Sequence, residues 1–132
     1  MCQLFIGADS ELWESRTKSL RIDGAATSVR IENFFWATLE EIAIRDGMTV
    51  NQLITKLYHE SIDAEHDLGN FTSFLRVCCA RYHALMAAGD VSNSLDDALG
   101  TMAAADILSR EKSRRQSSML LKAERLAAHE LN

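Results

Sequence analysis

Only a few residues of this chain have types and spacings that could carry out chemistry. His59, Asp63 and His66 would share one face of a helix and could bind a metal ion, although a solvated helix end is the simpler interpretation. The adjacent Cys78 and Cys79 could serve a redox role. The sequence has no phosphate-binding glycine loop, serine-hydrolase elbow or zinc-protease motif. We therefore expect neither an enzyme nor a bound cofactor or metal.

A cluster of basic residues lies in the first quarter of the chain. Residues 16–31 carry four basic side chains and one acidic one, which gives this segment a net charge of +3. The whole chain has a net charge of −5, which argues against a general attraction to nucleic acid, because such affinity comes largely from neutralised phosphates. Any contact with nucleic acid must therefore depend on the local cluster, which consists of Arg16, Lys18, Arg21 and Arg30.

This basic cluster lies in two segments whose polarity alternates with the period of a β-strand, Lys18–Asp23 and Thr27–Glu32. In the second segment Ser28 and Arg30 share one face, and the opposite face is apolar apart from Thr27. No other segment is typical of a strand. In the first segment Leu20 and Ile22 share one face, and in the second Thr27, Val29 and Ile31 are expected to face inward.

The period changes to that of a helix at Asn33. Asp46-Gly47 should end this first helix, because glycine is common just past a helix end. Thr49 and Gln52 have the spacing of a capping box and should begin a second helix. In the first helix we expect Phe35, Leu39, Ile42 and Ala43 to face inward and Glu40, Glu41 and Arg45 to face outward. In the second we expect Val50, Leu53, Ile54, Leu57, Tyr58 and Ile62 to face inward.

Three further helical stretches are expected, at 70–88, Leu95–Arg110 and Ser117–Leu131, the last two joined by a basic linker at 110–115. The first should begin at the N-cap Asn70. Its inward stripe should be Phe71, Phe74, Leu75, Cys78, Tyr82, Leu85 and Met86, with Cys79 on the flank. The expected organisation is an N-terminal segment 1–17, a core 18–66, a supporting helix 67–90 and a helical extension 91–132.

Several motifs together resemble a bacterial subfamily of ribbon-helix-helix domains. The turn Gly47-Met48-Thr49 matches the family's G-x-S/T/N turn between two helices. The chain departs from the subfamily at Lys18, where arginine is usual, and at Ile31, where leucine is usual. The resemblance covers about residues 1–88. Its other motifs are Met1-Cys2-Gln3-Leu4-Phe5, Lys18-Ser19-Leu20-Arg21, Gly24, Thr27-Ser28-Val29-Arg30-Ile31-Glu32, Phe35-Trp36, Leu39, Ile42-Ala43 and Asn70-Phe71-Thr72-Ser73-Phe74-Leu75-Arg76-Val77-Cys78.

The resemblance implies a mainly α fold with one short β-strand and additional C-terminal helices. A lone strand at Thr27–Glu32 would leave its edges unpaired, so two chains should each donate one strand to an antiparallel ribbon. The ribbon-helix-helix dimer would then bury a common core. The core expected at the dimer interface consists of Val29, Ile31, Phe35, Trp36, Leu39, Ile42, Leu53 and Leu57.

The function that the resemblance implies is sequence-specific binding of double-stranded DNA by a transcriptional regulator. The intersubunit ribbon would enter the major groove, with base contacts from Ala26, Ser28 and Arg30. Arg30 can bind a guanine bidentately. The expected phosphate contacts are Lys18, Arg21, Met48, Thr49 and Val50, the last three at a helix N-terminus.

Other partners and the cellular location follow from the rest of the chain. Besides a homodimer, a higher oligomer through residues 91–132 stays open, as does an antitoxin-like role in which the C-terminal helices bind a protein partner. The sequence lacks an apolar run of membrane-spanning length and a secretory signal. Its cysteine number is odd, at three, which favours a reducing compartment. We therefore expect a cytoplasmic protein that does not bind membranes.

Overall fold

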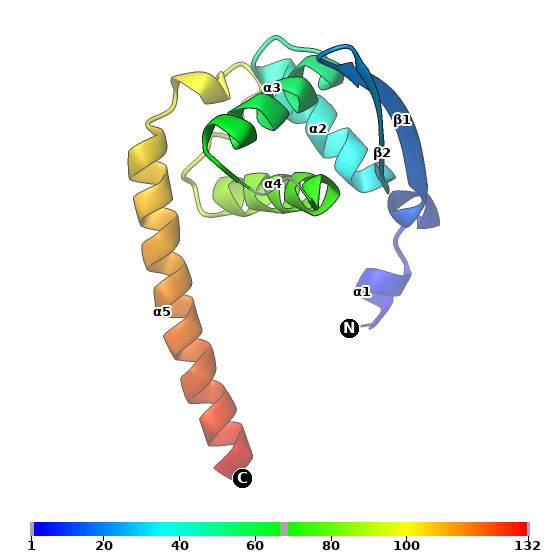
Figure 1. The fold of residues 1–132 in the computed structure, drawn as a ribbon. Coiled ribbons are helices and arrows are strands. Elements are labelled where there is room, and N and C mark those ends of the chain that lie inside the picture. Colours follow the sequence, from blue (N-terminus) through cyan, green and yellow to red (C-terminus); the bar gives the residue numbers. More distant parts are fainter. Residues whose placement is uncertain (1, 67–68, 132) are drawn as a thin grey trace. The chain divides into compact units, whose positions relative to one another are not determined.

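The computed structural model describes residues 2–66 and 69–131 (Figure 1). Met1, Asp67, Leu68 and Asn132, which belong to the segments considered above, lie outside the described residues. The chain divides into two units, 1–100 and 101–132, which are described separately. The elements are α1 (Cys2–Ile6), η1 (Ser10–Trp13), β1 (Ser15–Ile22), β2 (Ala25–Glu32), α2 (Asn33–Arg45), α3 (Val50–Asp63), α4 (Phe71–Ala87), η2 (Leu99–Thr101) and α5 (Ala104–Leu131).

The ribbon is a hairpin within one chain. β1 pairs with β2 in an antiparallel register that runs from Ser15 opposite Glu32 to Ile22 opposite Ala25. Asp23 and Gly24 connect the strands with φ values of 54° and 82°. Two consecutive positive φ values are typical of a type I′ turn, whose twist matches that of the flanking strands. The mainly α fold with an antiparallel ribbon is thus confirmed, but it contains two strands where the sequence led us to expect one.

One face of the hairpin packs on the helices. On this face Leu20, Ile22, Val29 and Ile31 are buried, and all of them except Ile22 join the hydrophobic core of the first unit. α2 contacts β2, α3 and α4, so it lies at the centre of this unit (Figure 1). The core cluster is Leu20, Val29, Ile31, Trp36, Leu39, Ala43, Leu53, Ile54, Leu75 and Cys79.

The turn between α2 and α3 follows the sequence prediction. Gly47 has a φ of 67°, and the N–H groups of Gly47 and Met48 donate to the carbonyls of Ile44 and Ala43. This is the hydrogen-bond pattern of a Schellman motif, which ends α2. The capping box at the start of α3 is also present, with Thr49 and Gln52 bonding to each other's backbone N–H. At the other end of α3, the predicted inward Ile62 is 48% exposed.

Two further side chains are buried, although the sequence placed them outside the inward faces of their helices. Arg45, expected to be solvated, is buried, and its guanidinium donates to the carbonyls of Ser92 (2.7 Å) and Asp97 (2.9 Å). The chain after α4 folds back over the end of α2 and covers it. In α4 the buried cysteine is Cys79 and not Cys78, because the inward face runs through positions 75, 79 and 82.

The second unit contains one long helix. α5 runs without interruption from Ala104 to Leu131, where two helices with a basic linker were expected. Residues 95–103 contain no α-helix, only the short η2. Lysine and arginine are good helix formers, and no glycine or proline interrupts the basic stretch, so it continues the helix. Within the described ranges, no helix has the length and apolar content needed to cross a membrane.

Candidate nucleic-acid interface

Besides the end pair, Ser15 opposite Glu32, the outer face of the hairpin has six exposed side chains in three cross-strand pairs. Thr17 lies opposite Arg30, Ser19 opposite Ser28, and Arg21 opposite Ala26. None of the six is acidic. The predicted base contacts Ala26, Ser28 and Arg30 thus lie on one exposed surface, and β1 adds three more side chains that sequence reasoning did not include.

Arg30 is the most available hydrogen-bond donor on this face. No hydrogen bond or ion pair connects its guanidinium with any other described residue, so its five N–H groups can all donate to a ligand. Arg21 is partly engaged, since its Nη1 donates to the carbonyl of Gly24 at 3.1 Å. Arg30 is therefore free toward the open end of the hairpin, whereas Arg21 is hydrogen-bonded to the turn.

The other two basic residues of the cluster lie beside α2. The Lys18 ammonium is 5.0 Å from the centre of the Trp36 ring, and the Arg16 guanidinium is 5.9 Å from it. These are cation–π distances. Arg16 also forms an exposed ion pair with Glu40 at 3.8 Å. Lys18, a predicted phosphate contact, is thus directed toward the tryptophan and away from the outer face.

The hairpin is attached to the helices at its turn and at its open end. At the turn, His59 Nε2 lies 2.9 and 3.0 Å from the Asp23 carboxylate oxygens. Near the open end, the indole N–H of the fully buried Trp36 donates to the carbonyl of Arg16 at 2.9 Å. These contacts fix the orientation of the outer face relative to α2 and α3.

At the end of β2, Arg76 Nε on α4 donates to both carboxylate oxygens of Glu32, at 3.0 and 3.1 Å. This hydrogen bond lowers the pKa of Glu32. The pair also compensates the negative charge at the end of the ribbon. Glu32 therefore repels a nearby phosphate less than an unpaired carboxylate would.

The predicted phosphate site at the start of α3 is partly occupied by internal hydrogen bonds. The N–H of Met48 donates to Ala43, and the N–H of Thr49 donates to the side chain of Gln52 at 2.9 Å. Among the described residues, nothing accepts the N–H groups of Val50 and Asn51. An anion at this helix N-terminus would therefore bind to those two groups.

The residues considered for metal or redox chemistry have other roles. His59 contacts Asp23, and the part of the chain that the structure describes contains no group of three side chains suited to a metal ion. Burial raises the pKa of the Cys78 thiol, and it raises the pKa of Cys79 to about 12. Both cysteines are therefore protonated at neutral pH, which disfavours nucleophilic or redox reactivity.

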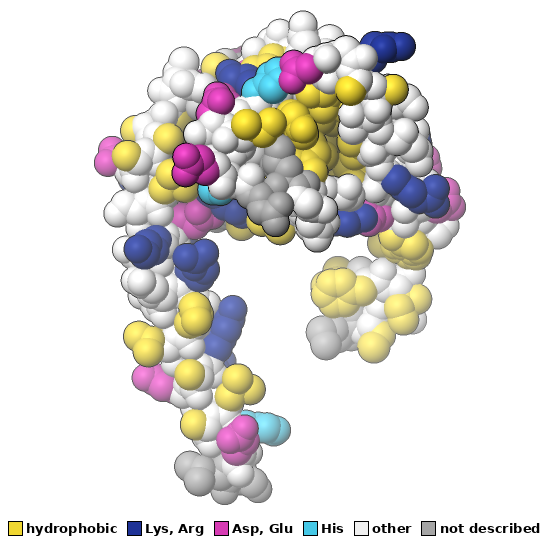
Figure 2. Space-filling view, viewed as in Figure 1, with side chains coloured by type: hydrophobic (Ala, Val, Ile, Leu, Met, Phe, Trp, Pro, Cys, Tyr) yellow, Lys and Arg dark blue, Asp and Glu magenta, His cyan; other side chains and the backbone are white. Residues whose placement is uncertain are grey.

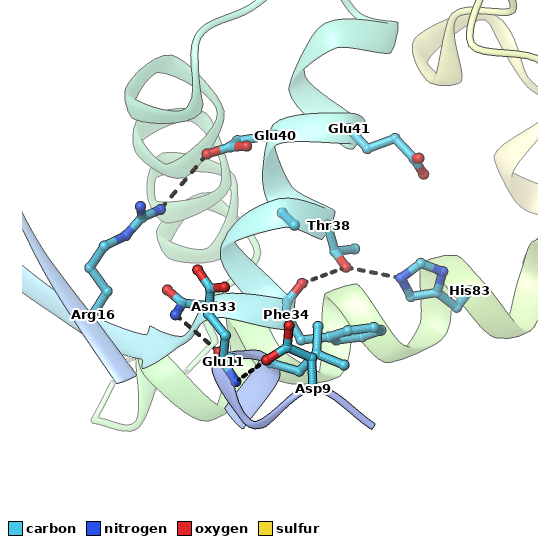
Figure 3. Close-up of a pocket in the computed structure, with 11 residues that line it drawn as sticks. Asp9, Glu11, Arg16, Asn33, Phe34, Thr38, Glu40, Glu41 and His83 are labelled. Carbon is cyan, nitrogen blue, oxygen red and sulfur yellow. Dashed lines mark hydrogen bonds and ion pairs between the residues drawn. The ribbon is translucent and has the colours of Figure 1, made fainter. Parts of the chain in front are cut away.

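A groove of about 450 Å³ beside η1, α2 and α4 was not predicted from the sequence (Figure 3). Arg16 is the one lysine or arginine among its lining residues, which include four carboxylates. Thr38 Oγ1 lies 3.0 Å from the Phe34 carbonyl and 2.9 Å from His83 Nε2. Since the threonine hydroxyl donates to the carbonyl, it accepts from Nε2–H of the histidine. The acidic lining makes this groove unsuited to a nucleic-acid phosphate.

Comparison with known proteins gives a family. A ribbon-helix-helix domain matches residues 15–83. The chain belongs to the ribbon-helix-helix domain family. It is also similar to the solved structure of an uncharacterized protein from Bordetella pertussis Tohama I, with 46% identity over 82% of this chain and 86% of that one, and a TM-score of 0.78. No curated protein matches the chain.

The ribbon-helix-helix match agrees with the elements of the structure. It begins at the first residue of β1 and ends within α4, so both strands of the hairpin belong to the domain. The supporting helix α4 is mostly included, whereas α5 lies outside the match. The family makes this a DNA-binding or related regulatory fold.

Proposed function

We propose that this ribbon-helix-helix protein is a sequence-specific DNA-binding transcriptional regulator that contacts bases with the outer face of its β1–β2 hairpin. The observation that supports this most is the composition of that face: its three inner pairs carry two arginines and three hydroxyl side chains, and its one acid, Glu32 in the end pair, is bonded to Arg76. Elsewhere in residues 1–100 acidic side chains outnumber basic ones, so this face differs in charge from its surroundings.

The dimensions of DNA favour the hairpin of a single chain as the ribbon. The major groove is ~12 Å wide and admits a two-stranded ribbon whose strands lie ~4.8 Å apart. Two hairpins joined edge to edge would span ~14 Å between their outer backbones alone. The ribbon expected from the sequence has two strands, one β2 from each chain. It would form as a two-stranded ribbon only if β1 separated from β2. We therefore propose one hairpin per major-groove segment.

Individual side chains suit different parts of the DNA. Arg30 can donate bidentately to O6 and N7 of guanine, which discriminates by ~1–3 kcal/mol. Ser19 and Ser28 can donate to or accept from several bases, and Ala26 can contact a thymine methyl group. Arg21, near the turn, suits a phosphate, as do the N–H groups at the start of α3.

We propose that the regulator acts as a homodimer in the cytoplasm, because ribbon-helix-helix domains typically dimerise. The residues that were expected to form the dimer core belong to the hydrophobic core of a single chain. Val29, Ile31, Trp36, Leu39 and Leu53 are already buried there, while Phe35, Ile42 and Leu57 are partly buried against them. The proposed dimer therefore uses a surface other than the fully buried side chains.

A second candidate function is binding of a protein partner, as in antitoxins. The exposed apolar side chains of α5 favour it: Met119, Leu120, Leu121 and Leu126 are each more than half exposed. Such a protein would bind its partner without the hairpin. Substitutions on the hairpin's outer face therefore separate the two functions.

Fluorescence anisotropy with genomic fragments recovered by footprinting tests the proposal. Wild-type protein should bind its fragment at ~50 mM salt, and Arg30→Ala should lose ~1–3 kcal/mol of the preference for that fragment over unrelated DNA. Lys56→Ala, which removes an exposed lysine from α3, is the matched control and should bind as wild type. Failure of the wild-type protein to bind any fragment at this salt concentration would refute a DNA-binding function.

A further inference from the structure

Charge is distributed very unevenly between the two units. Residues 1–100 contain eight basic and fifteen acidic residues, a net charge of −7. Residues 101–132 contain six basic and four acidic residues, a net charge of +2. The hairpin's outer face carries only two arginines, of which Arg30 is assigned to a base, so it neutralises few phosphates, from which much of the DNA affinity comes. The positive charge of the second unit therefore needs an explanation.

The basic residues of α5 are concentrated in its middle. From Lys112 to Arg125 the sequence has five basic residues and one acidic residue, Glu124. At about 100° of rotation per residue, Glu124 lies on the opposite side of the helix from Arg115 and Lys122. On the face seen in Figure 2, basic side chains gather along the first half of α5, and hydrophobic side chains lie among acidic ones beyond them.

Four of these cations are available to a ligand. Lys112, Arg115, Lys122 and Arg125 are exposed, and no hydrogen bond or ion pair connects them with another residue in the described ranges. Their spacings of three, seven and three residues keep them within one broad side of the helix. They extend over ~20 Å, at 1.5 Å per residue. Over that length a DNA strand presents about six phosphates, at 3.4 Å each.

We propose that this basic side of α5, defined by Lys112, Arg115, Lys122 and Arg125, binds the phosphate backbone of DNA as a second contact, separate from the hairpin. The proposal rests on the DNA-binding function proposed above. This contact carries no sequence information, because phosphates are the same at every base pair. It supplies affinity, while the hairpin supplies specificity.

An anionic membrane surface is the less favoured ligand. A helix that lies on a membrane has its apolar residues on one face and its basic residues on the other. In α5 the exposed apolar side chains are spread around the axis, since Leu120 and Leu121 differ by about 100° and Leu126 lies beside Lys122. The extended row of cations matches a phosphate backbone better.

The test compares the full-length protein with a variant that carries Lys112→Gln, Arg115→Gln, Lys122→Gln and Arg125→Gln. Glutamine preserves helix propensity, which circular dichroism can verify. A matched control, Asp106→Asn with Glu124→Gln, changes charge on the other side of α5. Affinity for the specific fragment is measured by anisotropy from ~50 to ~200 mM salt, where each phosphate contact contributes ~0.9 to the salt slope.

The proposal predicts that the quadruple variant loses up to ~3.6 units of salt slope per chain, so that its affinity falls ~100-fold less than that of wild type over this range. Its preference for the specific fragment over unrelated DNA should persist. The control should bind at least as tightly as wild type.

A quadruple variant with the salt slope of wild type would overturn the proposal. A changed slope would also overturn it if sedimentation shows that the oligomeric state of the variant has changed as well. If wild type binds, Arg30→Ala loses preference and the quadruple variant keeps its slope, only the α5 contact is wrong. If wild type binds no DNA, the proposed function itself fails.

Discussion

At the scale of residues, the outer face depends on side chains that hold the hairpin while Arg30 stays available. Glu32 and Arg76 form a bidentate contact between the end of β2 and α4. Trp36 bonds to β1 near the same open end, and His59 bonds to the turn. These side chains hold the hairpin through hydrogen bonds to the helices. Arg30 takes no part in those bonds and therefore stays available on the outer face.

The lowered pKa of Glu32 predicts a pH dependence of stability. A carboxyl whose pKa is lower in the folded state stabilises the fold above its ordinary pKa of 4.5, and this contribution is lost as the pH falls through the lowered value. Glu32→Gln should therefore be less stable than wild type near neutral pH, and the difference should shrink on acidification. Urea unfolding between about pH 7 and pH 3 measures it.

The control for this experiment is Glu60→Gln, at an exposed position on α3. It should reproduce the pH profile of wild type. A constant stability difference between wild type and Glu32→Gln across the whole range would contradict the assigned ion pair.

At the scale of elements, the Thr49 cap determines where α3 begins. Thr49→Ala removes the acceptor for the N–H of Gln52, which lies 3.1 Å away, and should cost ~1 kcal/mol of stability. Thr49→Ser retains the hydroxyl and should lie close to wild type. Urea unfolding compares the three proteins. Equal stability of the alanine and serine variants would show that the cap does not stabilise α3.

The elements also show what could be predicted from the sequence. Alternating polarity located the strand residues and their buried faces, because the two faces of a strand have different surroundings. It could not identify which edge of Thr27–Glu32 is paired, since backbone hydrogen bonds leave no trace in side-chain polarity. The signal for the hairpin was Asp23-Gly24, a favoured type I′ pair between two alternating segments.

Other differences arose from tertiary contacts. The burial of Arg45 depends on carbonyls near residues 92–97, far along the chain, which helix periodicity does not register. Cys78 and Cys79 both border the apolar stripe, and only the packing of α4 against the core decides between them. At the candidate site, β2 was predicted correctly as an exposed row, whereas the contribution of β1 required knowledge of the pairing.

At the scale of the whole molecule, we expect two chains to bind each DNA site as a dimer. Sedimentation velocity of the free protein should give twice the 14.7 kDa of one chain, and the DNA complex should contain two chains. A concentration series would reveal a tetramer formed through residues 91–132. A monomer both free and on DNA would contradict the dimer.

The most direct test of the central claim is selection of preferred sequences from random double-stranded DNA by wild type, Arg30→Ala and Arg30→Lys. The account predicts that wild type selects a site with a required guanine and that Arg30→Ala loses this preference while other positions persist. Arg30→Lys should keep much of the affinity but weaken the preference, because lysine lacks the bidentate fork. Identical selected sites for wild type and Arg30→Ala would contradict base recognition by the hairpin.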